Sequence, residues 1–195
     1  MARISSAPVT LDVRRHKQTH VDDSALIRRF ISAIAACADE YDEYGQPVTP
    51  PEPVETPRAA LDKLYRLIPG PLPYLFEELL LSYRWPKSDL DTLTVFPNPR
   101  GPGLNAFAQE PLIDKGLAEM LLPARYVQFA RGGGGNYDPV CFDLRAASAS
   151  DCPIVQIDHE EILCNYRIKP VAVLASSFRA LLRTLAMPAG TSAHS

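Results

Sequence analysis

The sequence predicts an α+β domain, with a single, mainly antiparallel sheet of about five to six strands and helices packed on one face. Two observations carry this prediction. Helical patterns of apolar residues come first, mostly consecutive short strand-like segments follow, and one more helical pattern closes the chain. The length of 195 residues and the hydrophobic share of 46% fit one globular domain with its own core and a modest extension.

The chain begins with a mixed polar and basic segment, residues 1–22, which we expect to form an N-terminal arm. A helix is predicted from the capping cluster Asp22-Asp23-Ser24 to about Tyr41, because apolar residues recur there at helical spacing. Prolines then dominate residues 45–57 and favour an extended connection without helix or ladder hydrogen bonds. The expected organisation is an arm, a helix with its connection, a main domain and a tail, over residues 1–22, 23–57, 58–187 and 188–195.

Two helices are predicted at the start of the main domain. Thr56-Pro57 is typical of a helix start, because proline suits the first helical position, and this helix is expected to run to about Leu67. The next segment, IPGPLPYLFEELLLSYRW, predicts an amphipathic helix that needs a large packing partner. Its apolar face carries Leu72, Leu75, Phe76, Leu79, Leu80 and Tyr83.

Strand-like segments separated by Gly, Pro, Asn and Asp follow Pro86. They cover residues 92–96, 126–130, 139–143, 154–158 and 162–168. A short helix is predicted between the first two, over residues 110–122. The last helix is expected to be capped by Ser176 and Ser177 and to end before Pro188.

The composition argues against several classes of partner. A net charge of −3 and an isoelectric point near 5.8 offer no basic stripe for phosphates, so we expect no nucleic-acid partner. No apolar run has the length of a signal peptide core or of the roughly 20 residues of a membrane span, so we expect a cytoplasmic protein without a membrane partner. The 4 cysteines lack Cys-x-x-Cys spacing and are expected to be free thiols.

The segment ARGGGGNYDPVCFD, residues 130–143, contains four consecutive glycines. Backbone N–H groups of such a run can hold an anion when a helix follows with Lys-Ser or Lys-Thr. Neither requirement is met, because the following residues are strand-like. We therefore expect a hairpin connection in which Asn136 tolerates a left-handed conformation and Asp138-Pro139 starts the next strand.

Acidic residues and a histidine, at Asp138, Asp143, Asp158, His159 and Glu160, are candidates for a metal or acid–base site. If residues 154–160 continue as a strand, Asp158 and Glu160 share one face and His159 lies on the other. The favoured interpretation is therefore a solvated strand end. The sequence also lacks His-Glu-x-x-His and Gly-x-Ser-x-Gly, so we expect no catalytic residues, bound metal or cofactor.

Trp85 is the single tryptophan and stands beside Arg84 and Pro86 at the exit of the second predicted helix. Tryptophan is enriched in binding hot spots, and it also closes the corners of hydrophobic cores. The core interpretation is slightly favoured, and both remain open at this point.

Five segments in a fixed order resemble the SUKH superfamily, also called the Smi/Knr family of cell-wall-assembly regulators. They are LIPGPLPYLFEELLLSYRW, LTVFPNP, GGGGNYDPVCFDL, CPIVQIDHEEI and VLASSFRALLRTL, and the resemblance covers roughly residues 58–187. Members often carry Asn-Gly-Gly after the second helix, where this chain has Ser82-Tyr83-Arg84-Trp85. The resemblance therefore carries no expectation for the shape or binding role of that loop.

The resemblance implies an α+β domain without catalytic residues. For bacterial members it also implies an immunity protein that binds and neutralises a polymorphic toxin. We therefore expect a non-catalytic protein-binding domain, with an intracellular regulator or scaffold and a small metal-dependent hydrolase as alternatives. The residues expected to contact the protein partner are Arg84, Trp85, Asn136, Tyr137, Asp138, Asp158, His159 and Glu160.

Overall fold

The computed structural model describes residues 13–37, 45, 47–90, 92–148 and 150–185, with side chains from residue 22 onward. The predicted arm and tail, residues 1–22 and 188–195, lie outside these ranges except where the first helix covers residues 13–22. None of the described helices combines the length and apolar character needed to span a bilayer.

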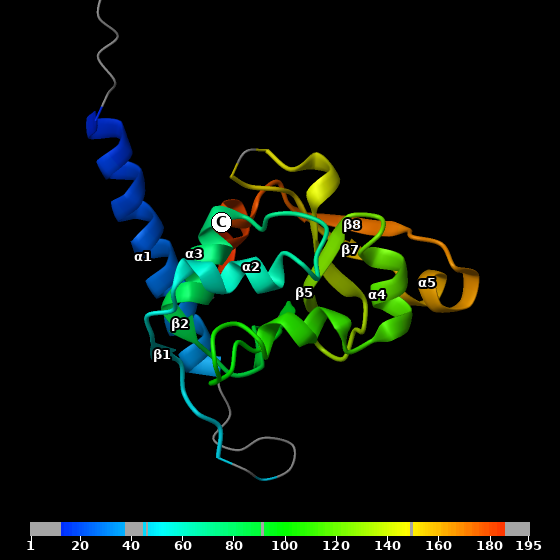
Figure 1. Ribbon diagram of the computed structural model, residues 1–195. Coiled ribbons are helices and arrows are strands. Elements are labelled where there is room, and N and C mark those ends of the chain that lie inside the picture. The colour runs from blue at the N-terminus through cyan, green and yellow to red at the C-terminus, as the bar shows by residue number, and fades with distance from the viewer. Residues whose placement is uncertain (1–12, 38–44, 46, 91, 149, 186–195) are drawn as a thin grey trace, which may run out of the picture.

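The predicted α+β fold is confirmed, because a six-stranded antiparallel sheet carries the molecule (Figure 1). Each strand pairs with the next in the sequence, in the order β3-β4-β5-β6-β7-β8. The strands are β3 (Ser88–Asp89), β4 (Leu93–Val95), β5 (Tyr126–Gly132), β6 (Pro139–Asp143), β7 (Ile154–Ile157) and β8 (Pro170–Ala175).

The larger group of helices covers one face of this sheet. It comprises α1 (Val13–Cys37), η1 (Arg58–Ala60), α2 (Leu61–Leu64), α3 (Tyr74–Ser82), η2 (Phe107–Leu112) and α6 (Phe178–Leu185). Phe76 of α3 lies at the centre, with its ring centroid 4.9 Å from Phe142 of β6 and 5.2 Å from Phe178 of α6. Phe129 of β5 stacks on Phe142 at 4.2 Å, so this aromatic cluster joins the sheet to two helices.

A smaller group packs on the opposite face, which the sequence did not predict. It consists of α4 (Lys115–Leu121) and α5 (His159–Asn165), and both lie on the far side of the molecule from α1 (Figure 1). Ile162 of α5 and Leu121 of α4 share an apolar cluster with Cys141 and Val155 of the sheet. Strands β6 and β7 are therefore buried on both faces.

The first helix is an integral part of the core. Phe30 and Ile34 are 1% and 0% exposed and belong to the same apolar cluster as the sheet. The helix also begins at Val13, earlier than the predicted start near Asp22. The expected boundary within residues 45–57 therefore separates two segments of chain that share one core.

Part of the proline-rich connection forms a short strand, although no ladder hydrogen bonds were expected there. The short strand β1 (Glu52–Pro53) lies antiparallel to β2 (Tyr83–Arg84). The backbone N–H groups of Val54 and Thr56 also donate to the carbonyls of Ser82 and Leu81. Proline removes only its own donor, so the residues between prolines remain able to pair.

The strand predicted over residues 162–168 is wrong. These residues belong to helix α5 and the turn after it, and the last strand, β8, comes later. Asp158 begins the helix, because its side-chain oxygen accepts a hydrogen bond from the Glu161 N–H at 3.0 Å. Tyr166, with φ of 51°, ends it in the left-handed conformation.

The glycine run connects β5 and β6, as predicted. Gly134 and Gly135 have φ values of 64° and 84°, which only glycine adopts without strain. Asn136 was expected to take this conformation, but it does not appear among the described non-glycine residues with positive φ. Its side chain instead accepts a hydrogen bond from the Asp138 N–H at 2.8 Å and closes the turn.

The last helix has two caps, of which one was predicted. Ser177 accepts a hydrogen bond from the Ala180 N–H at 3.0 Å. Asp151, from the loop before β7, accepts from the N–H groups of Phe178 at 2.8 Å and Arg179 at 3.3 Å. The β6–β7 connection is thereby tied to the start of α6.

Candidate functional site

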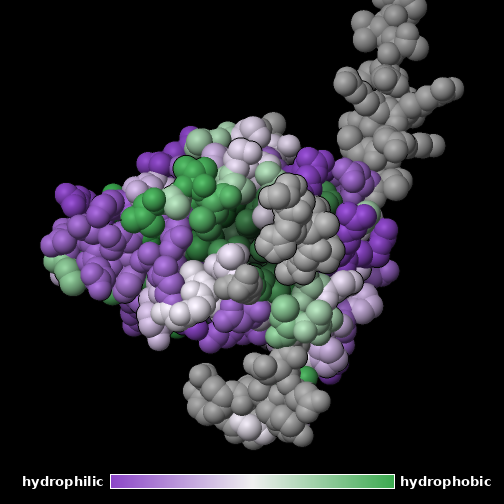
Figure 2. Space-filling model, turned by 180° about the vertical axis from the view of Figure 1, so that it is seen from behind, coloured by the Kyte–Doolittle hydropathy of each residue, from purple (hydrophilic) through white to green (hydrophobic). Residues whose placement is uncertain are grey.

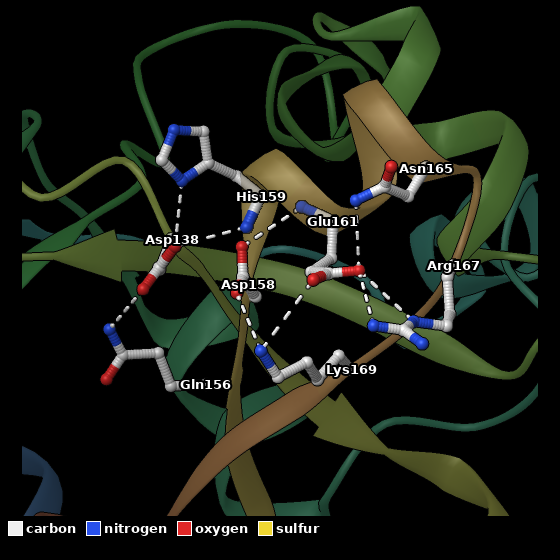
Figure 3. A network of polar contacts seen from close by, with 8 residues as sticks. All are labelled: Asp138, Gln156, Asp158, His159, Glu161, Asn165, Arg167 and Lys169. Atoms are coloured by element: carbon white, nitrogen blue, oxygen red, sulfur yellow. Dashed lines mark hydrogen bonds and ion pairs between the residues drawn. The ribbon is translucent and has the colours of Figure 1, made fainter.

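Asp138 and His159 meet where the β5–β6 loop approaches the start of α5 (Figure 3). The His159 ring donates from Nδ1 to Asp138 Oδ1 at 2.8 Å, and the His159 backbone N–H donates to the same oxygen at 3.1 Å. The other carboxylate oxygen accepts from the Gln156 amide at 3.1 Å. Because an ionised carboxylate only accepts, it fixes the proton of a neutral His159 on Nδ1.

Local backbone geometry positions this pair. Asp138 is held by the Asn136 turn and directly precedes β6, whereas His159 is the first residue of α5. Gln156 lies on β7, opposite Val140 of β6 in the sheet register. The start of β6, strand β7 and the start of α5 thus converge on one carboxylate at the end of the sheet, although the expected strand geometry kept Asp158, His159 and Glu160 apart.

The hydrogen bonds also set the ionisation of Asp138. Partial burial raises the pKa of its carboxyl, but the hydrogen bonds from the His159 side chain and backbone lower it more. The net pKa therefore lies below the ordinary value of 3.8. Asp138 is an anion at neutral pH and a fixed acceptor for the imidazole.

An oriented imidazole can serve as a proton carrier, and this was the basis of the hydrolase alternative. That alternative used Asp138, Asp143, Asp158 and His159. Of these four, the structure joins Asp138 and His159 by a hydrogen bond. Asp143 lies at the other end of β6 and binds Arg145 through two side-chain hydrogen bonds of 2.7 and 2.8 Å. Across the described ranges, no three His, Cys, Asp or Glu side chains form a group that could hold a metal ion.

A second set of ion pairs continues from this point along the surface (Figure 3). Arg167 donates to Glu161 at 2.7 Å, and Lys169 lies 3.4 Å from Asp158 and 3.8 Å from Glu161. The hydrogen bond from Glu161 N–H and the Lys169 contact hold the pKa of Asp158 below its ordinary value. These exposed pairs tie the start of α5 to the segment that leads into β8.

Three predicted partner-binding residues are accessible. Asn136 and Glu160 are exposed, and the Tyr137 ring is 62% exposed. Tyr137 lies between the Arg131 guanidinium, which is 5.3 Å from its ring centre, and the His159 ring, whose centre is 6.3 Å away. Together with Asp138, Asp158 and His159, these residues form a polar surface at one end of the sheet, which we call the polar end.

Arg84 and Trp85 do not belong to this surface, because both are buried, with exposures of 6% and 2%. Arg84 donates to the carbonyls of Leu80 and Gly103 at 3.0 Å, and Trp85 donates from Nε1 to Phe96 at 2.9 Å. The open question about Trp85 is therefore answered in favour of the core. A buried indole with a satisfied N–H closes the corner between α3 and β4.

The outermost strand, β8, was not predicted from the sequence. It is the last strand of the sheet, so its outer edge has no strand partner among the described residues. Val171, Val173 and Leu174 are 48%, 70% and 38% exposed. Figure 2 shows hydrophobic surface at the place of β8, bordered by the polar surface of the α5 side. The uncharged run PVAVLA between Lys169 and Ser176 is a sequence pattern that favours such a strand, although no strand was predicted there.

The start of α5 also had a recognisable pattern. Asp158 and Glu161 have the three-residue spacing typical of a helix N-terminus. The contact between Asp138 and His159 had no local pattern, because it depends on the pairing of β6 with β7. Comparison of the chain with protein-family models, curated proteins and solved structures finds no match.

Proposed function

We propose that this protein is a non-catalytic binding domain that recognises another protein through β8 and the adjacent polar end. The single observation that carries the proposal is the exposed apolar strand at the edge of an otherwise buried sheet. Natural sheets usually protect such edges with charges, prolines or covering segments. Apart from Pro170 at its first position and two register shifts, β8 has no such protection from any residue that the structure describes.

Strand addition is the binding mode that this edge supports. An extended segment of a partner gains main-chain hydrogen bonds from the free edge and places alternate side chains against exposed apolar ones. Val173, the most exposed of the three, offers the largest apolar contact. The contact contributes about 1.5 kcal/mol or more if a partner buries such a side chain fully.

The polar end supports a partner with basic groups. Glu160 is exposed and makes no hydrogen bond or ion pair with another described residue, so it is available to a Lys or Arg of the partner. The chain as a whole has a net charge of −3, which favours association with a basic protein. Tyr137, exposed beside the Asp138–His159 pair, is the aromatic anchor on this side.

The role proposed for this binding is immunity, the neutralisation of a toxin in the cytoplasm. It rests on the resemblance of residues 58–187 to the SUKH superfamily and on the proposed edge-strand interface. The 4 cysteines are free thiols, which suits a reducing compartment. A toxin that acts on nucleic acid is basic and would suit the acidic polar end.

The decisive experiment co-expresses the chain with a toxin domain encoded beside its gene and scores cell survival and co-purification. Val173→Lys and Glu160→Lys are expected to weaken binding by about tenfold or more, because each adds a charge that the interface does not accommodate. Leu67→Lys is the matched control, since Leu67 is 41% exposed but lies outside this surface. It is expected to protect as well as the unmodified chain.

Two results would contradict the proposal in different ways. If the unmodified chain neither protects nor binds, immunity is excluded, and isolation of partners from the native cell would test the regulator or scaffold alternative. If the chain protects and both charged variants protect equally well, immunity stands but the binding surface lies elsewhere.

A further inference from the structure

A cavity of about 690 Å³ lies beside the opposite edge of the sheet from β8. Its lining comes from the proline-rich connection, β2, the edge strand β3, the neighbouring strands β4 and β5, and the glycine loop after β5. Pro50, Pro86 and Pro99 contribute apolar wall. This volume falls in the range of roughly 300–1,000 Å³ typical of small-molecule sites.

The charges that line the cavity are mainly positive, although the whole chain is acidic. Four cations, Arg84, Lys87, Arg100 and Arg131, face two carboxylates, Glu52 and Asp89. Arg100 and Glu52 neutralise one another, with hydrogen bonds of 2.5 and 2.6 Å. The other three cations have no ion pair with a described carboxylate, so the described residues of the cavity wall carry an excess of positive charge.

Arg84 is the most unusual of these cations. It is buried, yet within the described part of the chain its guanidinium donates only to oxygens of Leu80, Tyr83, Gly103 and Thr56, which carry no net charge. Burial lowers the pKa of Arg84, and Glu52 is the one carboxylate that acts against this. A buried charge without its own counterion creates a positive potential in the space beside it.

Arg131 and Lys87 supply donors that a ligand can reach. Sheet register places Asp89, Thr94 and Arg131 side by side across β3, β4 and β5, so their side chains share one face. Arg131 contacts the Tyr137 ring but no carboxylate, and Lys87 is exposed without a hydrogen-bond partner among the described residues. The glycine loop borders the same space through Gly135.

We propose that this cavity binds a small organic anion, with its phosphate or carboxylate group between Arg131 and Lys87 and its body against the proline wall. Guanidinium groups bind both oxyanions through paired hydrogen bonds, and an ammonium group adds a point charge. The site is separate from the β8 surface, and the proposal does not depend on the proposed immunity role.

Calorimetric titration of the full chain tests this site. The probes are AMP for phosphate, citrate for carboxylate, and adenosine as the uncharged counterpart of AMP. We expect saturable binding of one AMP or one citrate per chain, weakening as salt is raised, and no binding of adenosine. AMP alone would identify phosphate as the preferred group, whereas citrate binding would show that carboxylates suffice.

The variants locate the site. Arg131→Met combined with Lys87→Met keeps most of the apolar volume, and we expect it to weaken anion binding by about tenfold or more. Arg66→Met removes an exposed arginine outside the cavity and should leave affinity unchanged. Thermal unfolding checks that both variants remain folded, because neither position is buried.

Three results would overturn the proposal: no saturable binding of either anion, equal affinity for adenosine and AMP, or equal losses in the cavity variant and the Arg66→Met control. Survival in the toxin assay is expected to be unaffected by Lys87→Met alone, because Lys87 contacts neither β8 nor the polar end, whereas Arg131 also contacts Tyr137. The two proposals can therefore fail separately.

Discussion

Asp23 of α1 and Arg179 of α6 form an ion pair between residues 156 positions apart in the sequence. Both terminal nitrogens of the guanidinium donate to the Asp23 carboxylate, one of them at 3.1 Å. Asp23 is 7% exposed, and its hydrogen bond raises the pKa of Arg179. The first and last described helices are thereby joined beside the core.

Removing one partner of this pair should destabilise the fold. Asp23→Ala leaves a partly buried guanidinium without its acceptor, and we expect a loss of about 1 to 3 kcal/mol. The measurement is urea unfolding of Asp23→Ala, Arg179→Met and the double variant. If the residues act as a pair, the double variant loses less than the sum of the single losses. Strict additivity would show that the contact contributes nothing.

The second prediction concerns the main domain expected from the sequence, residues 58–187, and whether it folds without α1. Removing α1 uncovers the apolar residues that face Phe30 and Ile34, so we expect a broad thermal transition for this fragment. A fragment of residues 13–187 is the control and should unfold cooperatively. A sharp transition for 58–187 at an unchanged temperature would show that α1 is dispensable.

The glycine loop predicts different costs at neighbouring positions. A Cβ on Gly132 would lie 2.8 Å from the Cβ and Cγ of Asn136, which must then move and lose its hydrogen bond to the Asp138 N–H. Gly134 has open space but a φ of 64°, so Gly134→Ala should cost about 1 kcal/mol and Gly134→Asn less. Chemical denaturation should rank Gly132→Ala as the most damaging. Adding Asn136→Gly to Gly132→Ala should recover the part of the stability loss that comes from the steric clash. A double variant no more stable than Gly132→Ala would show that the clash is not the cause.

Trp85 should behave as a core residue. Trp85→Ala removes a side chain that is 2% exposed, and we expect a loss of about 3 to 5 kcal/mol, similar to Phe142→Ala. Circular dichroism melting checks both variants. Weakened partner binding by Trp85→Ala would then reflect partial unfolding, and a stable Trp85→Ala variant would return this residue to the candidate interface.

Stability should fall in acid because three aspartates have lowered pKa values. The hydrogen bond from Arg145 is the main cause of the lowered pKa of Asp143. The pKa values of Asp138 and Asp158 are also lowered. A lowered folded-state pKa stabilises the fold above the unfolded value and is lost as pH falls through the folded value. We expect a plateau in their contribution above about pH 5 and a decline below about pH 4.

Asp143→Asn tests the part of that acid dependence that comes from Asp143. The variant should be less stable than the parent at pH 7 and should lose less stability between pH 5 and pH 3. Unfolding midpoints in urea across this range supply the comparison. Parallel curves for variant and parent would show that Asp143 does not contribute to the pH dependence.

Local sequence patterns predicted much of the sheet and helix order. Strand β6 matches the predicted residues 139–143, because Asp138-Pro139 and an apolar run define both its start and its interior. The strand predicted over residues 162–168 is wrong because their apolar and polar side chains fit a strand as well as a short helix. The Asp158 cap, just before this segment, is what begins a helix there. The position of α4 and α5 on the second face depends on tertiary packing, which periodicity does not encode.

The candidate site was predictable only in part. Tyr137, Asp138 and His159 were named from sequence, but their contact needs β6 and β7 in register and α5 at the end of β7. Trp85 was placed in the proposed interface because it follows a helix, whereas its indole turns inward toward Phe96. Exposure of a residue at the end of an element depends on which way the chain turns there.

The pairing of α1 with α6 has a consequence for synthesis of the chain. Translation proceeds at about 5–20 residues per second, so roughly 8 to 30 seconds separate the emergence of Asp23 from that of Arg179. During that interval α1 has left the ribosome while one of its packing partners does not yet exist. Its apolar stripe of Leu26, Phe30 and Ile34 remains incompletely covered. The nascent chain therefore presents a binding site for chaperones that closes only when α6 arrives.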